Sequence, residues 1–461
     1  MRRILKQAWP ILITQWASIA FGVLDTTMTG HASAVDLAAL ALGISIYITI
    51  FIGLMGVMHA LIPLQAQAFG AKKFSQIGEY WSQGIWVSII LSSIGALALS
   101  FPDVYLSLSG DIGPEVRERL TQYLQLLILG LPAALIFRTA YALANAVSRP
   151  RMIMNINLLG VALKAFFNWV FIFGHLGAPA MGTPGAALAS SIVYWVSLIV
   201  ALVWMTRTPF FTRFGLGLTR PVLSRIWEIL RLGLPMGASY MIEVGAFTFM
   251  ALIVAREGTS VTGAHQIVSN LAALGFMMPL SLSIATSALT AQAIGAQRLR
   301  EAQKTGSFGM RVVFGGAVLT AMAFYFGRDW IVAFYTADPD VATIALSLLV
   351  ILPWFHLIDA LHCVNAYLLR AYKIAMMPLL IQAFSLTAVG LIGGWFLGFG
   401  PGQAWVRPWL IQVFPNAPPG AATMWIMASV GLSLSSALLF SWYRHMTRVL
   451  LRTHASDTSK L

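Results

Sequence analysis

The sequence predicts an all-α integral membrane protein with twelve transmembrane helices, arranged as two six-helix bundles related by a pseudo-twofold axis along the membrane normal. Three observations predict this fold class. Hydrophobic residues make up 58% of the 461 residues and charged residues only 10%, against about 25% charged residues in a soluble domain. Apolar windows of about 20 residues, the length that crosses a bilayer, recur along the chain. The two halves of the sequence also resemble each other.

The apolar windows set the expected spans and domains. The first window, 8–30, contains Asp25 and is too long for the core of a signal peptide, so we expect it to remain as the first helix. A basic connector at 207–230 separates two expected six-helix lobes, 1–206 and 231–461. The other windows are 39–68, 84–101, 120–147, 154–174, 185–205, 230–254, 267–293, 309–326, 341–369, 376–397 and 421–443.

The excess of basic residues has a topological explanation. The chain has 29 Lys and Arg against 16 Asp and Glu, a formal net charge of +13. With the N-terminus inside, most of these cations fall in predicted cytoplasmic loops, as the positive-inside rule requires. We therefore expect both termini in the cytoplasm and a lipid bilayer, not nucleic acid, as the partner. The single Cys363 excludes an intrachain disulfide.

An internal repeat relates the two halves. A shift of 225 positions places Pro10 on Pro235 and aligns A-Q-A-F-G-A at 66–71 with A-Q-A-I-G-A at 291–296. A shift of 221 places Arg149 on Arg370 further along the chain. Because each half has an even number of spans, both copies share one orientation, which implies the axis along the membrane normal. Repeated halves of this kind are typical of carriers whose binding sites lie near the midplane.

Three acids lie inside predicted spans: Asp25, Glu243 and Asp359. An ionisable side chain at the bilayer centre costs about 2.5–3.5 kcal/mol on insertion scales, so it usually faces a cavity or a partner. We interpret all three as cation-binding or coupling residues. The alternative is that these acids are buried only for helix packing.

Neighbouring residues extend these candidate sites. On the first helix, Ser18 shares one face with Asp25, either as part of a cation site or as a polar packing seam. The acids at 243 and 359 have oxygen-bearing and aromatic side chains within one helical turn, which would supply cation ligands and substrate walls. These candidates are Ser239, Tyr240 and Phe247 around Glu243, and Phe355 and His356 before Asp359.

Two cations also lie inside predicted spans, Arg138 and Lys164. Our hypothesis is that one of them pairs with Asp25, or with a carbonyl at a helix end, when no substrate is bound. Alternatively, each extends to the lipid headgroups or contributes a static charge to a pore.

Several motifs together resemble the multidrug and toxic compound extrusion (MATE) family, most closely its NorM-type branch. They are W-P at 9–10, V-L-D-T-T-M-T-G at 23–30, S-A-V-D-L-A-A at 33–39, N-W-V-F-I-F-G at 168–174, L-G-L-P at 232–235 and H-L-I-D at 356–359. The resemblance runs over nearly the whole chain. It implies a secondary antiporter in the bacterial cytoplasmic (inner) membrane, with coupling assigned to Asp25 and cation binding to Glu243 and Asp359. Some relatives carry a second acid four residues after Asn168, where this chain has Ile172, which argues against a two-aspartate proton relay.

These observations lead to one functional prediction. The chain is a secondary active multidrug efflux transporter that exchanges organic, mostly cationic or amphipathic compounds for Na⁺ or H⁺ by alternating access. Glu243 and Asp359 are the expected metal ligands if the ion is Na⁺, and Asn168 either binds the ion or forms an interhelical hydrogen bond. A flippase for lipid-linked substrates remains the alternative. A polytopic enzyme is disfavoured because no paired nucleophile and base motif is present. We expect a monomer and no cofactor beyond the coupling ion.

Overall fold

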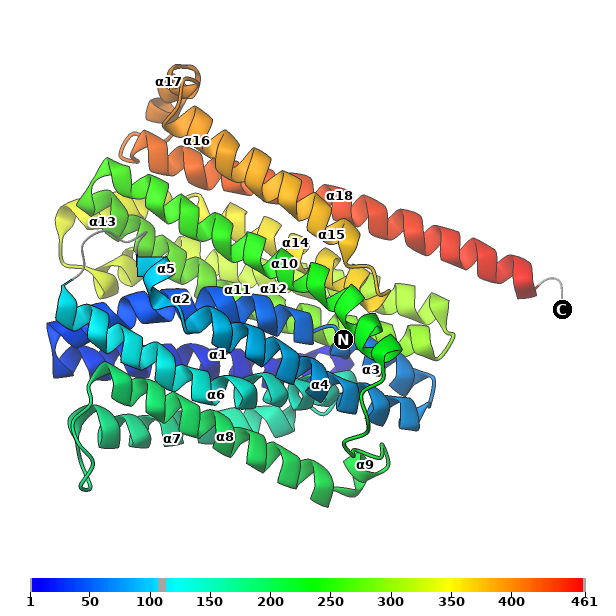
Figure 1. Ribbon diagram of the computed structural model, residues 1–461. Coiled ribbons are helices and arrows are strands. Elements are labelled where there is room, and N and C mark those ends of the chain that lie inside the picture. Colours follow the sequence, from blue (N-terminus) through cyan, green and yellow to red (C-terminus); the bar gives the residue numbers. More distant parts are fainter. Residues whose placement is uncertain (1, 107–112, 459–461) are drawn as a thin grey trace. The chain divides into compact units, whose positions relative to one another are not determined.

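The computed structural model describes residues 2–106 and 113–458, and helices are the regular elements of this part of the chain (Figure 1). Eleven of the described helices are long and apolar enough to cross a bilayer. A bent pair, α13 (Pro339–Leu348) and α14 (Leu352–Ala371), brings the total to twelve if it counts as one span. These findings confirm the predicted all-α membrane fold class.

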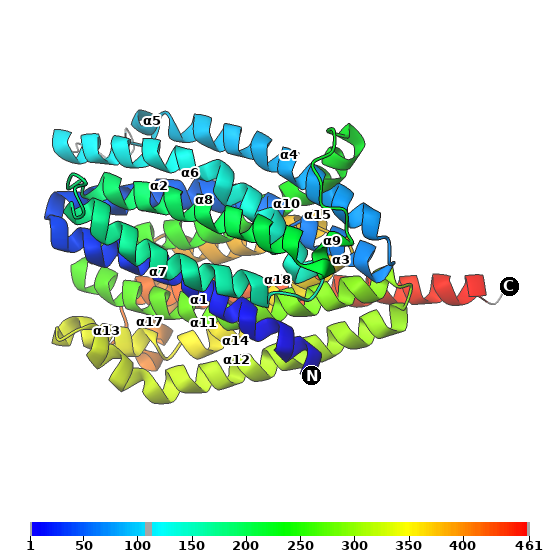
Figure 2. The same ribbon diagram turned by 90° about the horizontal axis from the view of Figure 1, so that it is seen from below.

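Contacts divide the chain into two units, which are described separately. The N-terminal unit comprises Trp9–Gly237. Within it, α6 and α8 lie side by side, and α7 packs along α8 (Figure 2). Its helices are α1 (Arg2–Ala32) from Trp9 onward, α2 (Ala34–Met58), α3 (Leu61–Gly70), α4 (Phe74–Leu99), α5 (Pro102–Leu106), α6 (Pro114–Ala146), α7 (Arg151–Phe173), α8 (Thr183–Arg207), α9 (Pro209–Thr212) and the first part of α10 (Leu223–Val254).

The C-terminal unit comprises Ala238–Leu461 together with Met1–Ala8. Its central helix is α14, which packs against α11, α12 and α18. Besides α13, α14 and the rest of α10, its helices are η1 (Ala255–Glu257), α11 (Thr259–Gly295), α12 (Leu299–Tyr335), α15 (Met376–Gln382), η2 (Ala383–Ile392), α16 (Gly393–Gly398), α17 (Gln403–Val413) and α18 (Pro419–Thr458).

Three of the predicted windows are not single straight α-helices. The window 39–68 is interrupted between Met58 and Leu61, where α2 gives way to α3. The window 341–369 bends by 47° between α13 and α14. Pro353 stands in the first turn of α14, where its missing N–H leaves no hydrogen bond unmade. In the window 376–397, the middle segment η2 is a π-helix of 10 residues.

The repeat is visible in the backbone of each unit. Lys72 and Gln297, which are 225 positions apart, both adopt left-handed conformations with φ of 58° and 60°. Ser148 and Lys373 form a second such pair at φ of 60° and 61°. The second pair keeps the 225-residue register, so the shift of 221 that placed Arg149 on Arg370 is wrong at this turn. The bonds that close these turns correspond as well: Lys73 N to Ala68 O, Arg298 N to Ala293 O, Arg149 N to Ala144 O, and Ile374 N to Leu369 O.

The basic connector is attached to α4 of its own unit. The Gln83 amide donates to Thr219 Oγ1 at 3.2 Å and to the carbonyl of Arg220 at 3.0 Å, and its oxygen accepts from Val222 N at 2.8 Å. Further on, Tyr80 donates to the Glu228 carboxylate at 3.0 Å. The predicted linker 207–230 thus contains α9 and the start of α10, with polar bonds that hold it along α4.

Candidate functional site

Asp25 and Lys164 form a buried ion pair inside the N-terminal unit. Lys164 Nζ lies 2.7 Å from Asp25 Oδ1, and the side chains are 0% and 9% exposed. Asp25 comes from α1 and Lys164 from α7. Of the two cations that the sequence offered as partners for this acid, the structure places Lys164 against it.

The Lys164 ammonium has oxygen partners on a third helix as well. It donates to the carbonyl of Ala186 at 2.8 Å and to Ser190 Oγ, both on α8. Ser190 Oγ itself donates to the Ala186 carbonyl at 2.9 Å. An ammonium carries three N–H donors. Three oxygen atoms from two helices therefore account for the whole hydrogen-bonding capacity of this buried cation.

Asn168 completes the cluster from one turn further along α7. Its Nδ2 donates to Asp25 Oδ1 at 2.8 Å, and the side chain is fully buried. Asn168 Oδ1 has no hydrogen-bond partner among the described residues. The amide therefore forms the predicted interhelical hydrogen bond, and its oxygen is left over as a potential ligand.

The remaining N-terminal candidates lie differently. Ser18 is exposed, and its hydroxyl donates to the carbonyl of Thr14 on the same helix at 3.1 Å. The Arg138 guanidinium lies over two rings of its own unit, 5.6 Å from the centroid of Phe51 and 5.5 Å from that of Tyr141. Such contacts stabilise a partly buried guanidinium. The substrate roles predicted for Ser18 and Arg138 stay predictions.

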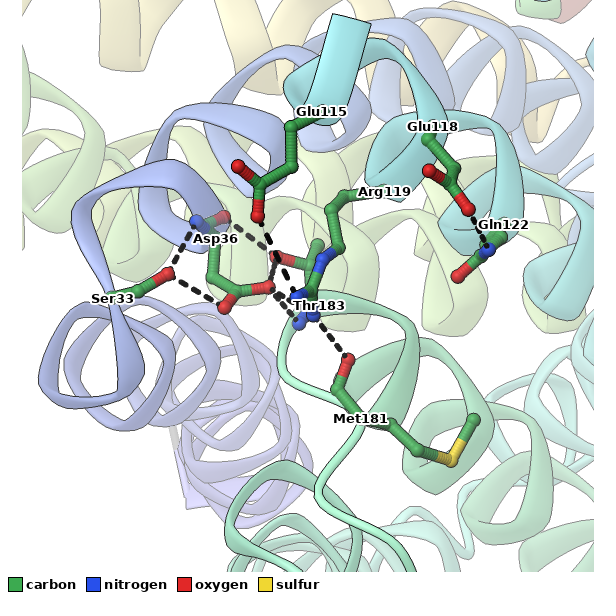
Figure 3. A network of polar contacts seen from close by, with 8 residues as sticks. All are labelled: Ser33, Asp36, Glu115, Glu118, Arg119, Gln122, Met181 and Thr183. Carbon is green, nitrogen blue, oxygen red and sulfur yellow. Dashed lines mark hydrogen bonds and ion pairs between the residues drawn. The ribbon is translucent and has the colours of Figure 1, made fainter.

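A second buried acid of this unit, Asp36, was not singled out from the sequence as a site residue. Figure 3 shows it between Ser33, Arg119 and Thr183. Ser33 caps α2 and donates to Asp36 Oδ2 at 2.7 Å, while Thr183 N donates to Oδ1 at 2.8 Å. Arg119 reaches the same Oδ1 at 3.3 Å and the carbonyl of Met181 at 3.2 Å.

The role of the Asp36 network is to join helix ends. It ties the start of α2 to α6 and to the start of α8, so it fixes three helices at one end of the unit (Figure 3). The signal was present in the sequence, because Ser33 and Asp36 have the spacing of a helix-capping box.

Glu243 and Asp359 line one cavity in the C-terminal unit. Glu243 comes from α10 and Asp359 from α14, and the two carboxyl groups interact electrostatically. The sequence predicted both acids, and the structure brings them to one cavity. The other lining residues are Ala246, Phe247, Met250, Phe355, Leu386, Gly390, Leu391, Met424, Ala428 and Leu432.

Aromatic rings form one wall of this cavity. Phe247 and Phe355 meet edge to face with ring centroids 5.8 Å apart, and both contact the buried Trp425. The Trp425 indole donates to His265 Nδ1 at 3.2 Å, which fixes the ring. Edge-to-face packing holds rings more firmly than area burial alone. Phe247 and Phe355 line the cavity, as the sequence predicted. Nothing in the sequence indicated a role for Trp425 or His265.

Three other candidates of this unit are outside the set of lining residues. Tyr240 shares a hydrogen bond with Tyr367 and accepts one from Arg370 Nη1 at 3.0 Å. His356 is buried against Phe324, with ring centroids 5.7 Å apart. Ser239 is also buried. The bonds of Tyr240 tie α10 to α14, the two helices that carry the acids.

The π-helix η2 forms another part of the lining and contributes Leu386, Gly390 and Leu391. It packs along α18, where the Cα of Gly431 lies so close that an added Cβ would be 2.5 Å from the carbonyl oxygen of Ser385. π-Helical segments occur frequently at functional sites. The close glycine contact lets this wall sit directly on α18.

No group of three or more His, Cys, Asp and Glu side chains that could hold a metal ion occurs in the part of the chain that the structure describes. Glu243 and Asp359 provide two carboxylates, so any sodium ion there would need carbonyl, hydroxyl or water oxygens as well. Hard oxygen ligands are those that such ions prefer. Sodium binding at this pair stays a prediction.

An acid-lined aromatic cavity within a multi-pass helical fold is typical of membrane transport proteins. The MatE family model matches residues 10–170 and 235–396. The chain therefore belongs to the MatE family. The matched segments begin 225 positions apart, as the repeat does, and the match confirms the resemblance seen in the sequence.

Relatives and solved structures agree with this family assignment. The chain is 34% identical to the probable multidrug resistance protein NorM of Aromatoleum aromaticum, over 98% of this chain and 94% of the relative. It is 31% identical to the multidrug resistance protein NorM of Vibrio vulnificus, over 95% and 93%. Its fold resembles the Vibrio cholerae MATE transporter VcmN in the bent form, with a TM-score of 0.83 at 18% identity over 97% of each chain. Membership of this transporter family confirms the prediction of a transporter, not an enzyme.

Proposed function

We propose that this protein is a multidrug efflux transporter that expels organic, mostly cationic compounds in exchange for Na⁺ or H⁺ by alternating access. The observation that carries the proposal is the convergence of Glu243 and Asp359 on one aromatic cavity. The names of the curated relatives support the transport of several drugs.

The chemistry of the cavity suits this cargo. Its two ionisable lining residues are both acids, and its walls are otherwise apolar or aromatic. A flat organic cation can place its charge near the carboxylates and its rings against Phe247 and Phe355. A lipid-linked sugar phosphate carries negative charge, which the same carboxylates would repel. The lining therefore favours the drug exporter over the flippase.

Competition for the two carboxylates couples the fluxes. An incoming Na⁺ or H⁺ that binds Glu243 and Asp359 weakens the hold on the drug, and the drug in turn displaces the ion. Each ligand must favour a different orientation of the transporter, because a ligand with equal affinity for both states shifts nothing. We further propose a cytoplasmic-membrane location, cytoplasmic termini and a monomeric state, in line with the loop charges and with one complete cavity in one chain.

The experiment is efflux from liposomes with a single driving gradient. Purified protein is reconstituted with ethidium as cargo and given either a sodium gradient or a pH gradient. We expect one gradient to drive transport and Glu243→Gln or Asp359→Asn to abolish it. The control is Glu301→Gln, the same chemical change at an exposed acid of α12. Full transport in both cavity variants would refute the site, and no response to either gradient would refute the coupling.

A further inference from the structure

The ammonium of Lys164 sits where a free cation would bind Asp25. It contacts Asp25 Oδ1 at 2.7 Å and the Ala186 carbonyl at 2.8 Å, and it also donates to Ser190 Oγ. A carboxylate, a carbonyl and a hydroxyl are the oxygen types that bind a hard monovalent or divalent cation. In this unit the cation is part of the chain.

The environment makes this internal cation hard to replace. A buried ammonium is tolerated only when its charge is balanced and its N–H groups are bonded. The Lys164 side chain is 0% exposed, its charge is balanced by Asp25, and its N–H groups are all bonded. The pair is also electrically neutral as a whole, so the Asp25 carboxylate offers little net attraction to a second cation.

A fourth oxygen lies in the same cluster. Asn168 donates its amide hydrogen to Asp25 Oδ1 at 2.8 Å, which directs the amide nitrogen, and not Oδ1, to the acid. Asn168 Oδ1 is buried and has no hydrogen-bond partner among the described residues. With the lysine in place this oxygen has no cation to bind. Without the lysine it would be available as a ligand.

We propose that Lys164 is a built-in cation of the N-terminal unit, which keeps exchangeable cations away from Asp25. Lys164 then determines which acids exchange ions, because it confines ion exchange to Glu243 and Asp359. This last step rests on the proposed function, whereas the occupation of Asp25 does not. Removing the ammonium converts the cluster into a sodium site with ligands from Asp25, Asn168, Ala186 and Ser190.

A purely structural ion pair makes a different prediction. If Lys164 only holds α7 to α1, its loss loosens the unit and creates no ion site. If Lys164 replaces a free cation, its loss creates a site that sodium fills and that depends on Asp25. Sodium binding to purified variants separates these possibilities without any measurement of transport.

The test uses radioactive sodium and equilibrium binding in choline buffer, in a Glu243→Gln/Asp359→Asn background. We expect this background protein to bind no sodium. Adding Lys164→Ala should give about one sodium ion per chain, and adding Asp25→Asn to that variant should abolish the binding. Lys164→Arg is the matched control, because it keeps a cation at this position and should create no site.

Two results would overturn the proposal. One is a folded Lys164→Ala variant that binds no sodium. The other is sodium binding in the background protein that disappears with Asp25→Asn, because Asp25 would then exchange cations in the presence of Lys164. If Lys164→Ala does not fold, Lys164→Ser replaces it and adds a small hydroxyl ligand. The comparison of the background protein with and without Asp25→Asn tests the proposal independently of either variant. Sodium binding in the background that persists with Asp25→Asn would contradict the proposed function instead.

Discussion

Lys164 Nζ lies 2.7 Å from Asp25 Oδ1, and both residues are buried in the N-terminal unit. Breaking such a pair leaves one buried charge without its partner, which costs about 3–5 kcal/mol. In choline buffer without sodium, we expect Asp25→Asn or Lys164→Ala to lower the melting temperature strongly. The double variant Asp25→Asn/Lys164→Ala should lose less than the two single losses combined.

The matched control for this pair is the exposed ion pair of Arg117 and Asp103 in the same unit. Exposed pairs contribute about 0.2–1 kcal/mol, so Asp103→Asn should hardly change the melting temperature. Thermal unfolding in detergent, followed by fluorescence, measures both pairs. Equal decreases in melting temperature for Asp25→Asn and Asp103→Asn would show that the buried pair contributes no more to stability than the exposed pair.

The aromatic wall of the cavity should set affinity more than coupling. Phe247→Leu keeps an apolar side chain but removes the edge-to-face contact with Phe355. The lost contact between this ring and the rings of ethidium would account for about 0.5–1.5 kcal/mol. We expect a rise of roughly 2- to 12-fold in the KM for ethidium, from about 1.4 kcal/mol per tenfold, with the ion dependence unchanged. Phe326→Leu, at a 75% exposed position of the same unit, is the control and should leave KM alone.

The contact between η2 and α18 predicts that alanine substitutions at two glycines differ sharply in their effect on thermal stability. A Cβ at position 431 would lie 2.5 Å from the Ser385 carbonyl oxygen, whereas one at position 390 meets its nearest atom at 3.6 Å. Overpacking of this kind costs about 1–3 kcal/mol. Gly431→Ala should therefore lower thermal stability, and Gly390→Ala should be tolerated. A tolerated Gly431→Ala would argue against the close contact of this wall with α18.

The Asp36 network predicts that the thermal stability of the protein depends on Arg119 and Gly182. Arg119→Ala leaves the buried Asp36 without its cation, an effect of about 1–3 kcal/mol. Gly182→Ala should be more damaging, because φ is +61° and a Cβ would lie 2.2 Å from Asp36 Oδ1. Melting curves of both variants, with the exposed Arg117→Ala as control, measure this. Arg119→Ala and Arg117→Ala should differ clearly.

Hydropathy predicted the spans well because apolar length is a property that each window carries by itself. It did not predict the interruption after Met58, the 47° bend before Leu352 or the π-helix η2. These features depend on local backbone hydrogen bonding and on close contacts with a neighbouring helix. An average over a window contains neither.

The sequence also identified the buried acids, because an ionisable group in an apolar span is conspicuous. It left open whether Arg138 or Lys164 faces Asp25, since that depends on the rotation of packed helices. On α10, Ser239 and Phe247 are each four residues from Glu243, yet only Phe247 is among the lining residues. The cavity extends from Glu243 toward the C-terminal end of α10, and helical spacing does not give that direction.

Competition between drug and ion at Glu243 and Asp359 is tested most directly by ethidium binding to the purified protein, followed by fluorescence anisotropy. Sodium replaces choline at constant ionic strength in one series, and the pH is lowered in another. Wild-type protein should bind ethidium about tenfold more weakly in one of the two series, a change of about 1.4 kcal/mol. The Glu243→Gln/Asp359→Asn variant should bind weakly and respond to neither. Wild-type affinity in that variant, still reduced by sodium or protons, would contradict the assignment of coupling to these acids.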